Sequence, residues 1–164
     1  MTLDLFPELQ RNAVSDETDE RYTTVAMVDA CLDLADVDQI DLDVAACEEA
    51  HWGERYFTRE TNGLSMPWDA ETVWCNPPWS DIEPWVVKAW SEMKRDLGPQ
   101  NIVMLLPAWT DRAWWQTLVE PARDRSPGFR SYFLRRYPFG SPGNPTAVGV
   151  DQPHFWCALL VWRR

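Results

Sequence analysis

The chain has 164 residues and a mass of 19.1 kDa, a length that suits one domain rather than two. It is 45% hydrophobic and 25% charged, as soluble globular proteins are, and no apolar run approaches the roughly 18 residues of a membrane span, so we expect no membrane partner. Its net charge of −11 by itself argues against a polyanionic partner, because phosphate contacts are made mainly by Lys and Arg.

Residues 1–20 are predicted to form an acidic, mobile leader. They combine Pro7 and acidic runs with few apolar groups, and they lack the basic and apolar segments of a secretory signal. We therefore expect one domain over residues 21–164 and a cytoplasmic location.

Apolar periodicity predicts alternating helices and strands from residue 24 onward. A helix is expected over residues 24–35, with Thr23 or Thr24 placed to cap it. The alternating apolar and acidic residues 40–44 predict a short strand, which a helix over 45–51 should follow. Residues 56–58 are a further candidate strand.

The second half continues this alternation of strands and helices. Its expected elements are strands at 72–75, 102–106, 129–134 and 154–162 and helices at 82–97 and 110–119. The whole pattern predicts an α/β fold with a mostly parallel sheet and an antiparallel C-terminal strand. In such sheets, ligand sites lie at the carboxyl ends of the parallel strands.

Neither a metal site nor a disulfide framework is expected. The four cysteines, Cys31, Cys47, Cys75 and Cys157, stand far apart without a CxxC pair, and the chain has only two histidines.

Charge is divided unevenly along the chain. Residues 1–71 hold 18 Asp and Glu against 4 Lys and Arg, whereas residues 72–164 hold 8 against 11. Six of those arginines fall within residues 111–136. A basic edge of this kind suits a nucleic-acid partner, although a solvated face would give the same pattern.

The strongest local signal is Asn76-Pro77-Pro78-Trp79, at the exit of an expected strand. The exocyclic amine of a nucleobase is a poor nucleophile, because its lone pair is delocalised into the ring. The Asn76 side-chain oxygen and the Pro77 carbonyl can accept its two N–H groups and stabilise the positive charge that develops on transfer. Trp79 can stack on the base, a contact worth roughly 1–3 kcal/mol. The alternative is a proline turn that only closes the strand, with Trp79 as an anchor.

A second, weaker signal is the acidic strand end that contains Asp41 and Asp43. A carboxylate at a strand terminus can hold the ammonium or hydroxyl groups of a ligand, and the small residues that follow let the backbone approach it. A solvated acidic strand end is the alternative. The chain has no GxGxxG here, so a dinucleotide-binding loop is not supported.

Several aromatic and basic residues are candidates for DNA contact or for the core. Trp109 and Arg112 follow a predicted strand end and could line a DNA cleft, and Lys88 is expected to be solvated. Candidate phosphate contacts, or else a solvated strand face, are Arg130, Arg135 and Arg136. The tryptophans at helical spacing are predicted to lie in the core, namely Trp85, Trp90, Trp114 and Trp115.

Together these segments resemble the short phage and prophage DNA adenine methyltransferases of the Dam-like type. The resemblance covers roughly residues 20–162. It rests on the order of segments 22–24, 40–46, 56–58, 62–64, 73–80 and 105–111, with Trp68 between the fourth and the fifth.

The resemblance implies a Rossmann-like fold that transfers a methyl group from S-adenosylmethionine to the N6 amine of an adenine flipped out of duplex DNA. It places Thr23 near the methionine carboxylate of the cofactor. It places Asp43 and Ala45, with Asp41 as a less certain member, around the methionine portion, and Asn62 near the adenine or ribose. Asn76, Pro77, Pro78 and Trp79 match the catalytic element. A phage origin would make the location the cytoplasm of a bacterial host.

The chain departs from the family pattern at four positions. Thr24 and Ala45 stand where Pro is common, Asn62 where Asp is frequent, and Trp79 where Tyr is usual. Trp79 preserves stacking, whereas Asn62 lacks a charge that ribose hydroxyls could use. Similar elements also serve methyltransferases of cytosine amines, RNA or protein glutamine, and a non-catalytic nucleic-acid-binding module is a further alternative.

Overall fold

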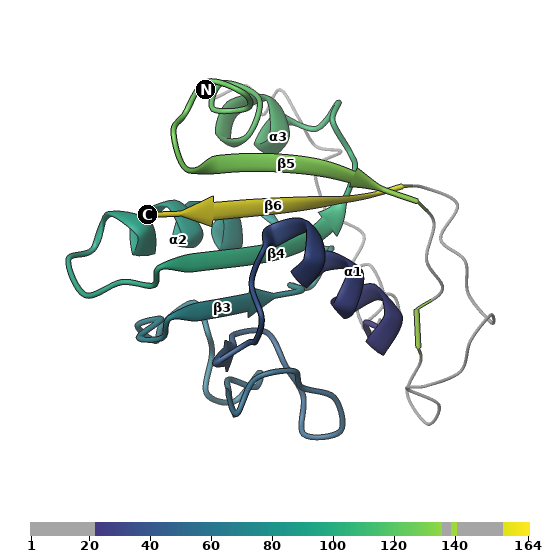
Figure 1. The fold of residues 1–164 in the computed structure, drawn as a ribbon, viewed down its shortest axis with the longest axis vertical. Coiled ribbons are helices and arrows are strands. Elements are labelled where there is room, and N and C mark those ends of the chain that lie inside the picture. Colours follow the sequence, from purple (N-terminus) through teal and green to yellow (C-terminus); the bar gives the residue numbers. More distant parts are fainter. Residues whose placement is uncertain (1–21, 136–138, 141–155) are drawn as a thin grey trace, which may run out of the picture.

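The computed structural model describes residues 22–135, 139–140 and 156–164, and its helices pack against one sheet (Figure 1). The expected leader, Arg136 and the first two residues of the last expected strand lie outside the described residues. The described elements, in chain order, are α1 Val25–Ala35, β1 Leu42–Asp43, β2 Arg55–Tyr56, β3 Thr72–Cys75, α2 Glu83–Lys94, β4 Asn101–Pro107, α3 Ala113–Leu118, β5 Phe129–Leu134 and β6 Cys157–Arg163.

The sheet is mixed, with strand order β2-β1-β3-β4-β6-β5. Strands β2, β1, β3 and β4 are parallel neighbours, and β6 runs antiparallel to both β4 and β5. The predicted α/β class with an antiparallel C-terminal strand is confirmed. Because β5 again runs in the direction of β4, the carboxyl ends of β1 to β5 meet at one edge, which we call the carboxyl edge.

The core lies along the central strands. All four residues of β3 are buried, as are all residues of β4 after Asn101, so these strands are covered on both faces. Figure 1 shows α1 across the near face of the sheet and α2 on the far face. Helices α2 and α3 are joined where the Trp90 indole Nε1 donates a hydrogen bond to the Leu118 carbonyl at 3.0 Å.

The predicted core tryptophans are confirmed. Trp85, Trp114 and Trp115 are buried, and Trp90 is half-buried between Phe129 and Trp162. The prediction that Lys88 is solvated is wrong, since its ammonium pairs with the buried Glu92 at 2.6 Å. Among the described helices, none has the length and hydropathy that a bilayer crossing requires.

The predicted helix at 45–51 is wrong. These residues form a turn in which Cys47 and Ala50 exchange backbone hydrogen bonds at 3.2 Å. The Ala46 N–H donates instead to the Phe57 carbonyl at 2.9 Å, beyond the end of β2. Partners outside the segment thus take backbone groups that a helix would need, and tertiary context overrides local propensity.

The helix limits also differ from expectation. Thr24 is the N-cap residue of α1, but its side chain makes no capping hydrogen bond. Helix α2 begins at Glu83, with Pro84 in its first turn, and it ends at Lys94 because Arg95 is extended. The end of the helix expected over 82–97 is therefore three residues too late.

Candidate active site

Asn76 is the first residue beyond β3 on the carboxyl edge. Pro77 and Pro78 follow it, and since neither has a backbone N–H, the strand cannot continue its ladder. The Asn76 amide Nδ2 donates a hydrogen bond to the Thr23 hydroxyl at 3.1 Å, and Thr23 is itself buried. The structure therefore brings a predicted catalytic residue into contact with a predicted cofactor residue 53 positions earlier.

Asp43 ends the neighbouring strand β1, opposite Trp74 of β3. It is buried, and its two carboxylate oxygens accept backbone N–H groups from Ala45 at 3.2 Å and from Trp52 at 3.1 Å. Burial raises the pKa of Asp43 to about 7, although these two hydrogen bonds lower it. The carboxyl group thus holds the turn after β1 in shape and titrates near neutral pH.

Asn62 lies in a tightly packed loop after β2, at the carboxyl edge. It has a positive φ of 54°, and its side-chain oxygen accepts the Leu64 N–H at 3.2 Å. The next residue, Gly63, lies so close to β1 that an added Cβ would stand 2.0 Å from the Val44 carbonyl oxygen. The Trp68 indole Nε1 fixes this contact by donating to the Gly63 carbonyl at 2.8 Å. Asn62 is therefore positioned beside the exit of β1.

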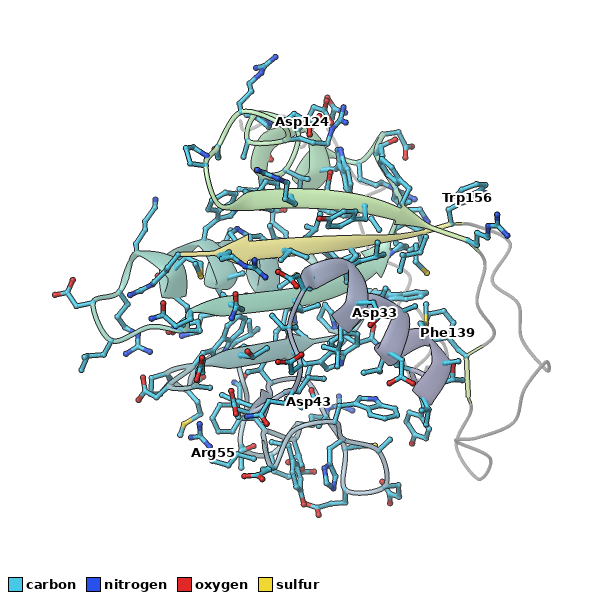
Figure 2. All side chains as sticks on the ribbon, in the orientation of Figure 1. Asp33, Asp43, Arg55, Asp124, Phe139 and Trp156 are labelled. Carbon is cyan, nitrogen blue, oxygen red and sulfur yellow. The ribbon has the colours of Figure 1, made fainter. Side chains whose placement is uncertain are left out.

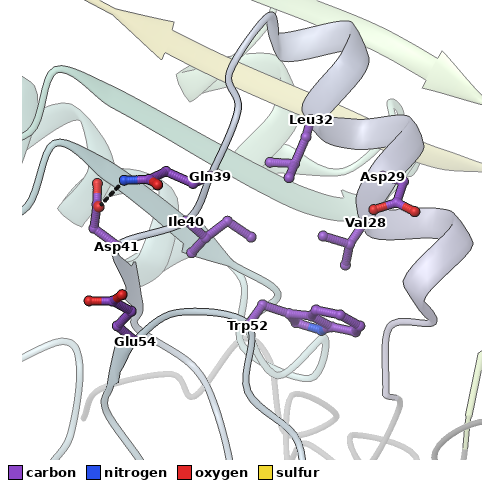
Figure 3. Close-up of a pocket in the computed structure, with 8 residues that line it drawn as sticks. All are labelled: Val28, Asp29, Leu32, Gln39, Ile40, Asp41, Trp52 and Glu54. Atoms are coloured by element: carbon purple, nitrogen blue, oxygen red, sulfur yellow. Dashed lines mark hydrogen bonds between the residues drawn. The ribbon is translucent and has the colours of Figure 1, made fainter.

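Asp41 lies at the opposite, amino end of β1. Its carboxylate accepts hydrogen bonds from the Thr72 backbone N–H at 2.8 Å and from the Gln39 side-chain Nε2 at 3.0 Å. The contact with Thr72 connects β1 to β3 where the two strands begin. Asp41 borders a pocket of about 300 Å³ beside α1 (Figure 3). The pocket is lined by Val28, Asp29, Leu32, Gln39, Ile40, Asp41, Trp52 and Glu54. Asp43 and Asn76 do not line it, so the structure does not group Asp41 with the other candidate site residues.

The three residues after Asn76 differ in exposure. Pro77 and Trp79 are buried, whereas Pro78 is exposed. The Trp79 ring packs against Phe139 in a T-shaped arrangement, with ring centroids 5.2 Å apart and planes at 88°. Trp79 thus packs against Phe139 beside the exit of β3, and Phe139 is a supporting residue that sequence reasoning missed.

The candidate DNA contacts divide between the two edges of the sheet. The Arg112 guanidinium lies 5.5 Å from the centroid of the Trp109 ring, and both residues follow β4 at the carboxyl edge. Arg135, exposed, follows β5 at that edge. Arg130 pairs with Val161 near the start of β5, so it lies toward the amino edge, away from the others. The remaining candidate, Arg136, lies outside the described residues.

Sequence reasoning also missed Trp156, which precedes β6 and is 52% exposed. An aromatic residue at the end of a segment rich in Pro and Gly was the available signal. Among the described residues, no group of three or more His, Cys, Asp or Glu side chains could hold a metal ion.

The family described as DNA N-6-adenine-methyltransferase (Dam) matches residues 11–125. The chain belongs to this family. The match includes Thr23, Asp43, Asn62 and Asn76, and it ends before β5.

Two phage proteins named DNA N-6-adenine-methyltransferase are similar to parts of the chain. The protein of Escherichia phage T1 is 41% identical over 76 residues, which are 46% of this chain and 31% of that protein. The protein of Haemophilus phage HP1 (strain HP1c1) is 31% identical over 86 residues, which are 52% of this chain and 49% of that protein. The similarity thus spans less than half the length of either relative.

Proposed function

We propose that the chain is a DNA adenine methyltransferase that transfers a methyl group from S-adenosylmethionine to the N6 amine of adenine. Membership of the Dam family supports the reaction class. The observation that carries the proposal is the hydrogen bond between Thr23 and Asn76 at the carboxyl edge. This hydrogen bond joins Thr23, which we assign to cofactor binding, with Asn76, which we assign to binding of the adenine amine.

The residues at the exit of β1 fit S-adenosylmethionine, which supplies, when bound, a methyl group on a positively charged sulfur. The small residues Ala45 and Ala46 follow Asp43 directly and are partly exposed, so the backbone there is open to close approach. Asp43 shapes this turn through Ala45 and Trp52. Thr23 would lie near the methionine carboxylate, and Asn62 would lie near the adenine or ribose. This arrangement supports a Rossmann-like methyltransferase version of the α/β fold.

Asn76 and Pro77 would hold the target amine. The Asn76 side-chain oxygen and the Pro77 carbonyl would accept its two N–H groups and stabilise the positive charge that develops on the nitrogen. The contact from Asn76 Nδ2 to Thr23 orients the amide so that its oxygen, and not its nitrogen, would meet the amine. Trp79, held by Phe139, would stack on the base, and the proton that the amine loses would pass to water.

The site requires an adenine outside the helical stack. Asn76 and Trp79 lie at the end of a buried strand, where a base within a duplex cannot place its amine, so the target adenine would have to flip out. Duplex DNA is therefore the proposed partner, and the cytoplasm of a bacterial host is the proposed location.

The test is methyl transfer from labelled S-adenosylmethionine to duplex DNA, RNA and protein, followed by nucleoside and amino-acid analysis. The expected product is N6-methyladenine in DNA. Label in cytosine, in RNA or in protein glutamine would contradict the proposal in favour of one of those acceptors. Absence of measurable S-adenosylmethionine binding by calorimetry would instead favour a non-catalytic binding module.

A further inference from the structure

Trp156 is an exposed aromatic residue at the carboxyl edge. It is 52% exposed, and Figure 2 shows it projecting beyond the sheet where β5 ends and β6 begins. Its backbone is fixed, because its carbonyl accepts the Ala108 N–H at 2.8 Å. The ring is therefore presented to solvent from a defined position beside the exit of β4.

The strand register places aromatic and basic groups around Trp156. Cys157, the first residue of β6, pairs with Pro107 of β4 and with Leu134 of β5. Trp156 therefore lies between the segment that follows β4, which carries Trp109 and Arg112, and the segment that follows β5, which begins with Arg135. Two Trp and two Arg residues therefore follow or precede neighbouring strands at this edge.

The distance from Trp156 to the exit of β3 suits a DNA contact. Strand β4 alone separates β3 from β6. The register places the Trp156 backbone two strands across and three residues further out than Asn76. At about 4.8 Å between strands and 3.3 Å per residue, the two lie roughly 14 Å apart. A nucleotide that flips out rotates about its own backbone, so its neighbours in the duplex remain close to the site that its base enters.

We propose, on the basis of the function proposed above, that Trp156 stacks on a DNA base beside the position that the flipped adenine vacates. Extruding a base removes its stacking partners, and aromatic side chains can replace them. Arg112 and Arg135 supply the positive charge that the flanking phosphates require. An isolated exposed Trp needs no explanation. A Trp whose backbone is fixed, beside the strand end that Arg135 follows and on the carboxyl edge that also carries Arg112, matches a base-stacking surface.

The test compares Trp156→Ala with Trp156→Phe on two DNA substrates. One is a paired duplex that contains an adenine methylated by the wild-type enzyme, and the other has the same adenine opposite a mismatched base. On paired DNA we expect Trp156→Ala to lower kcat/KM about tenfold, because it removes one stacking contact. On mismatched DNA, where extrusion is easier, we expect the loss to shrink to about twofold or less. Trp156→Phe should stay close to wild type on both substrates.

Leu97→Ala is the matched control, since Leu97 is 81% exposed and lies before β4, at the amino edge. It should leave kcat/KM unchanged on both substrates. Trp156→Leu, which keeps apolar bulk without a stacking plane, should reproduce the Trp156→Ala result and serves as the test if Ala destabilises the fold.

Two results would overturn the proposal: wild-type activity of the Ala and Leu variants on paired DNA, or an equal loss on both substrates. Absence of DNA methylation by the wild-type enzyme would instead show that the proposed function is wrong.

Discussion

The contact between Thr23 and Asn76 determines what the Asn76 amide offers to a ligand. A side-chain amide carries a donor and an acceptor on one carbon, so a rotation of 180° exchanges them. In the structure, Nδ2 donates to the Thr23 hydroxyl at 3.1 Å, and this orientation commits the oxygen to the other side. An amine that needs acceptors for its N–H groups would be repelled by the rotated amide.

Thr23→Val tests this orienting role, because it removes the hydroxyl at nearly constant volume. We expect the methyl-transfer rate at saturating S-adenosylmethionine and DNA to fall about tenfold, since a hydrogen bond contributes about 1 kcal/mol and the freed amide can rotate. Thr23→Ser, which keeps the hydroxyl, should retain most of the rate. A Val variant as fast as wild type with both substrates saturating would contradict the role.

Asp43 combines burial with two hydrogen bonds to the backbone. Its pKa of about 7 lies far above its ordinary value of 3.8, because burial disfavours the charged form more than the N–H groups of Ala45 and Trp52 favour it. The folded chain therefore keeps a proton on Asp43 over a pH range in which the unfolded chain has released it.

The raised pKa makes stability depend on pH. Between about pH 4 and 7 the folded state binds more protons than the unfolded state, so the contribution of Asp43 to the unfolding free energy should fall as pH rises, by about 4 kcal/mol at most. Urea unfolding at several pH values, compared with Asp43→Asn, would measure this contribution. We expect a steeper fall for the wild type than for the variant. Parallel pH profiles would show that Asp43 is already ionised in the folded chain.

At the scale of elements, the long apolar segments were predictable because burial dominates them. The apolar run at 102–106 corresponds to β4, and the expected helix at 82–97 corresponds to α2. The buried residues of both elements follow the apolar pattern of the sequence closely. The strand at 72–75 was predictable for a second reason, since two prolines mark its end. Asn76 could be placed at a strand exit from the sequence for the same reason.

The connection between β1 and β2 could not be predicted in the same way. Its turn depends on the Ala46 N–H meeting the Phe57 carbonyl and on the Trp52 N–H meeting the Asp43 carboxylate. These partners lie nine to eleven residues apart, beyond the reach of local periodicity. The helical pattern at 45–51 was therefore a correct description of local preference and a wrong prediction of structure.

Helix α2 is tied to the loop that carries Asn62 by a buried carboxylate. Glu92 pairs with Lys88 at 2.6 Å and with Arg95 at 2.8 Å, and it accepts the Trp68 N–H at 3.3 Å. Burial would raise the pKa of Glu92, but these three partners together lower it. Because Trp68 also holds the Gly63 carbonyl, the network links α2 to the exit of β1.

Glu92→Ala should destabilise the fold by roughly 3–5 kcal/mol, because it leaves Lys88, Arg95 and the Trp68 N–H without their shared acceptor. Glu48→Ala is the matched control, as it removes an exposed carboxylate that accepts one hydrogen bond, from the Tyr56 hydroxyl at 2.8 Å, and should cost about 1 kcal/mol or less. Unfolding free energies in urea would compare the two. Equal effects would mean that the Glu92 network does not stabilise the loop.

At the scale of the whole molecule, the uneven charge separates two parts of the proposed site. The acidic residues 1–71 contain the exits of β1 and β2, where the methyl donor would bind, and residues 72–164, with 11 Lys and Arg against 8 Asp and Glu, contain Asn76 and the edge with Arg112 and Arg135. The total charge of −11 therefore does not describe the face that DNA would meet.

Strand direction decides which of the candidate DNA-contact residues lie at the carboxyl edge. Arg112 and Arg135 follow strands that run toward the carboxyl edge, whereas Arg130 lies near the start of β5. A sequence shows that an arginine is near a strand but not which end of that strand points to the site. For the same reason, Trp156 became a candidate only when the register of β6 placed it beside Ala108.

The central claim is that Asn76 serves an adenine amine at the exit of β3. The most direct measurement is mass spectrometry of nucleosides from bacteria without adenine methylation of their own that express either the wild-type chain or Asn76→Ala. We predict N6-methyladenine in DNA from the wild type and none from the variant, although the purified variant should bind S-adenosylmethionine with nearly unchanged affinity. N6-methyladenine in both, or in neither when both proteins are folded and bind the methyl donor, would contradict the claim.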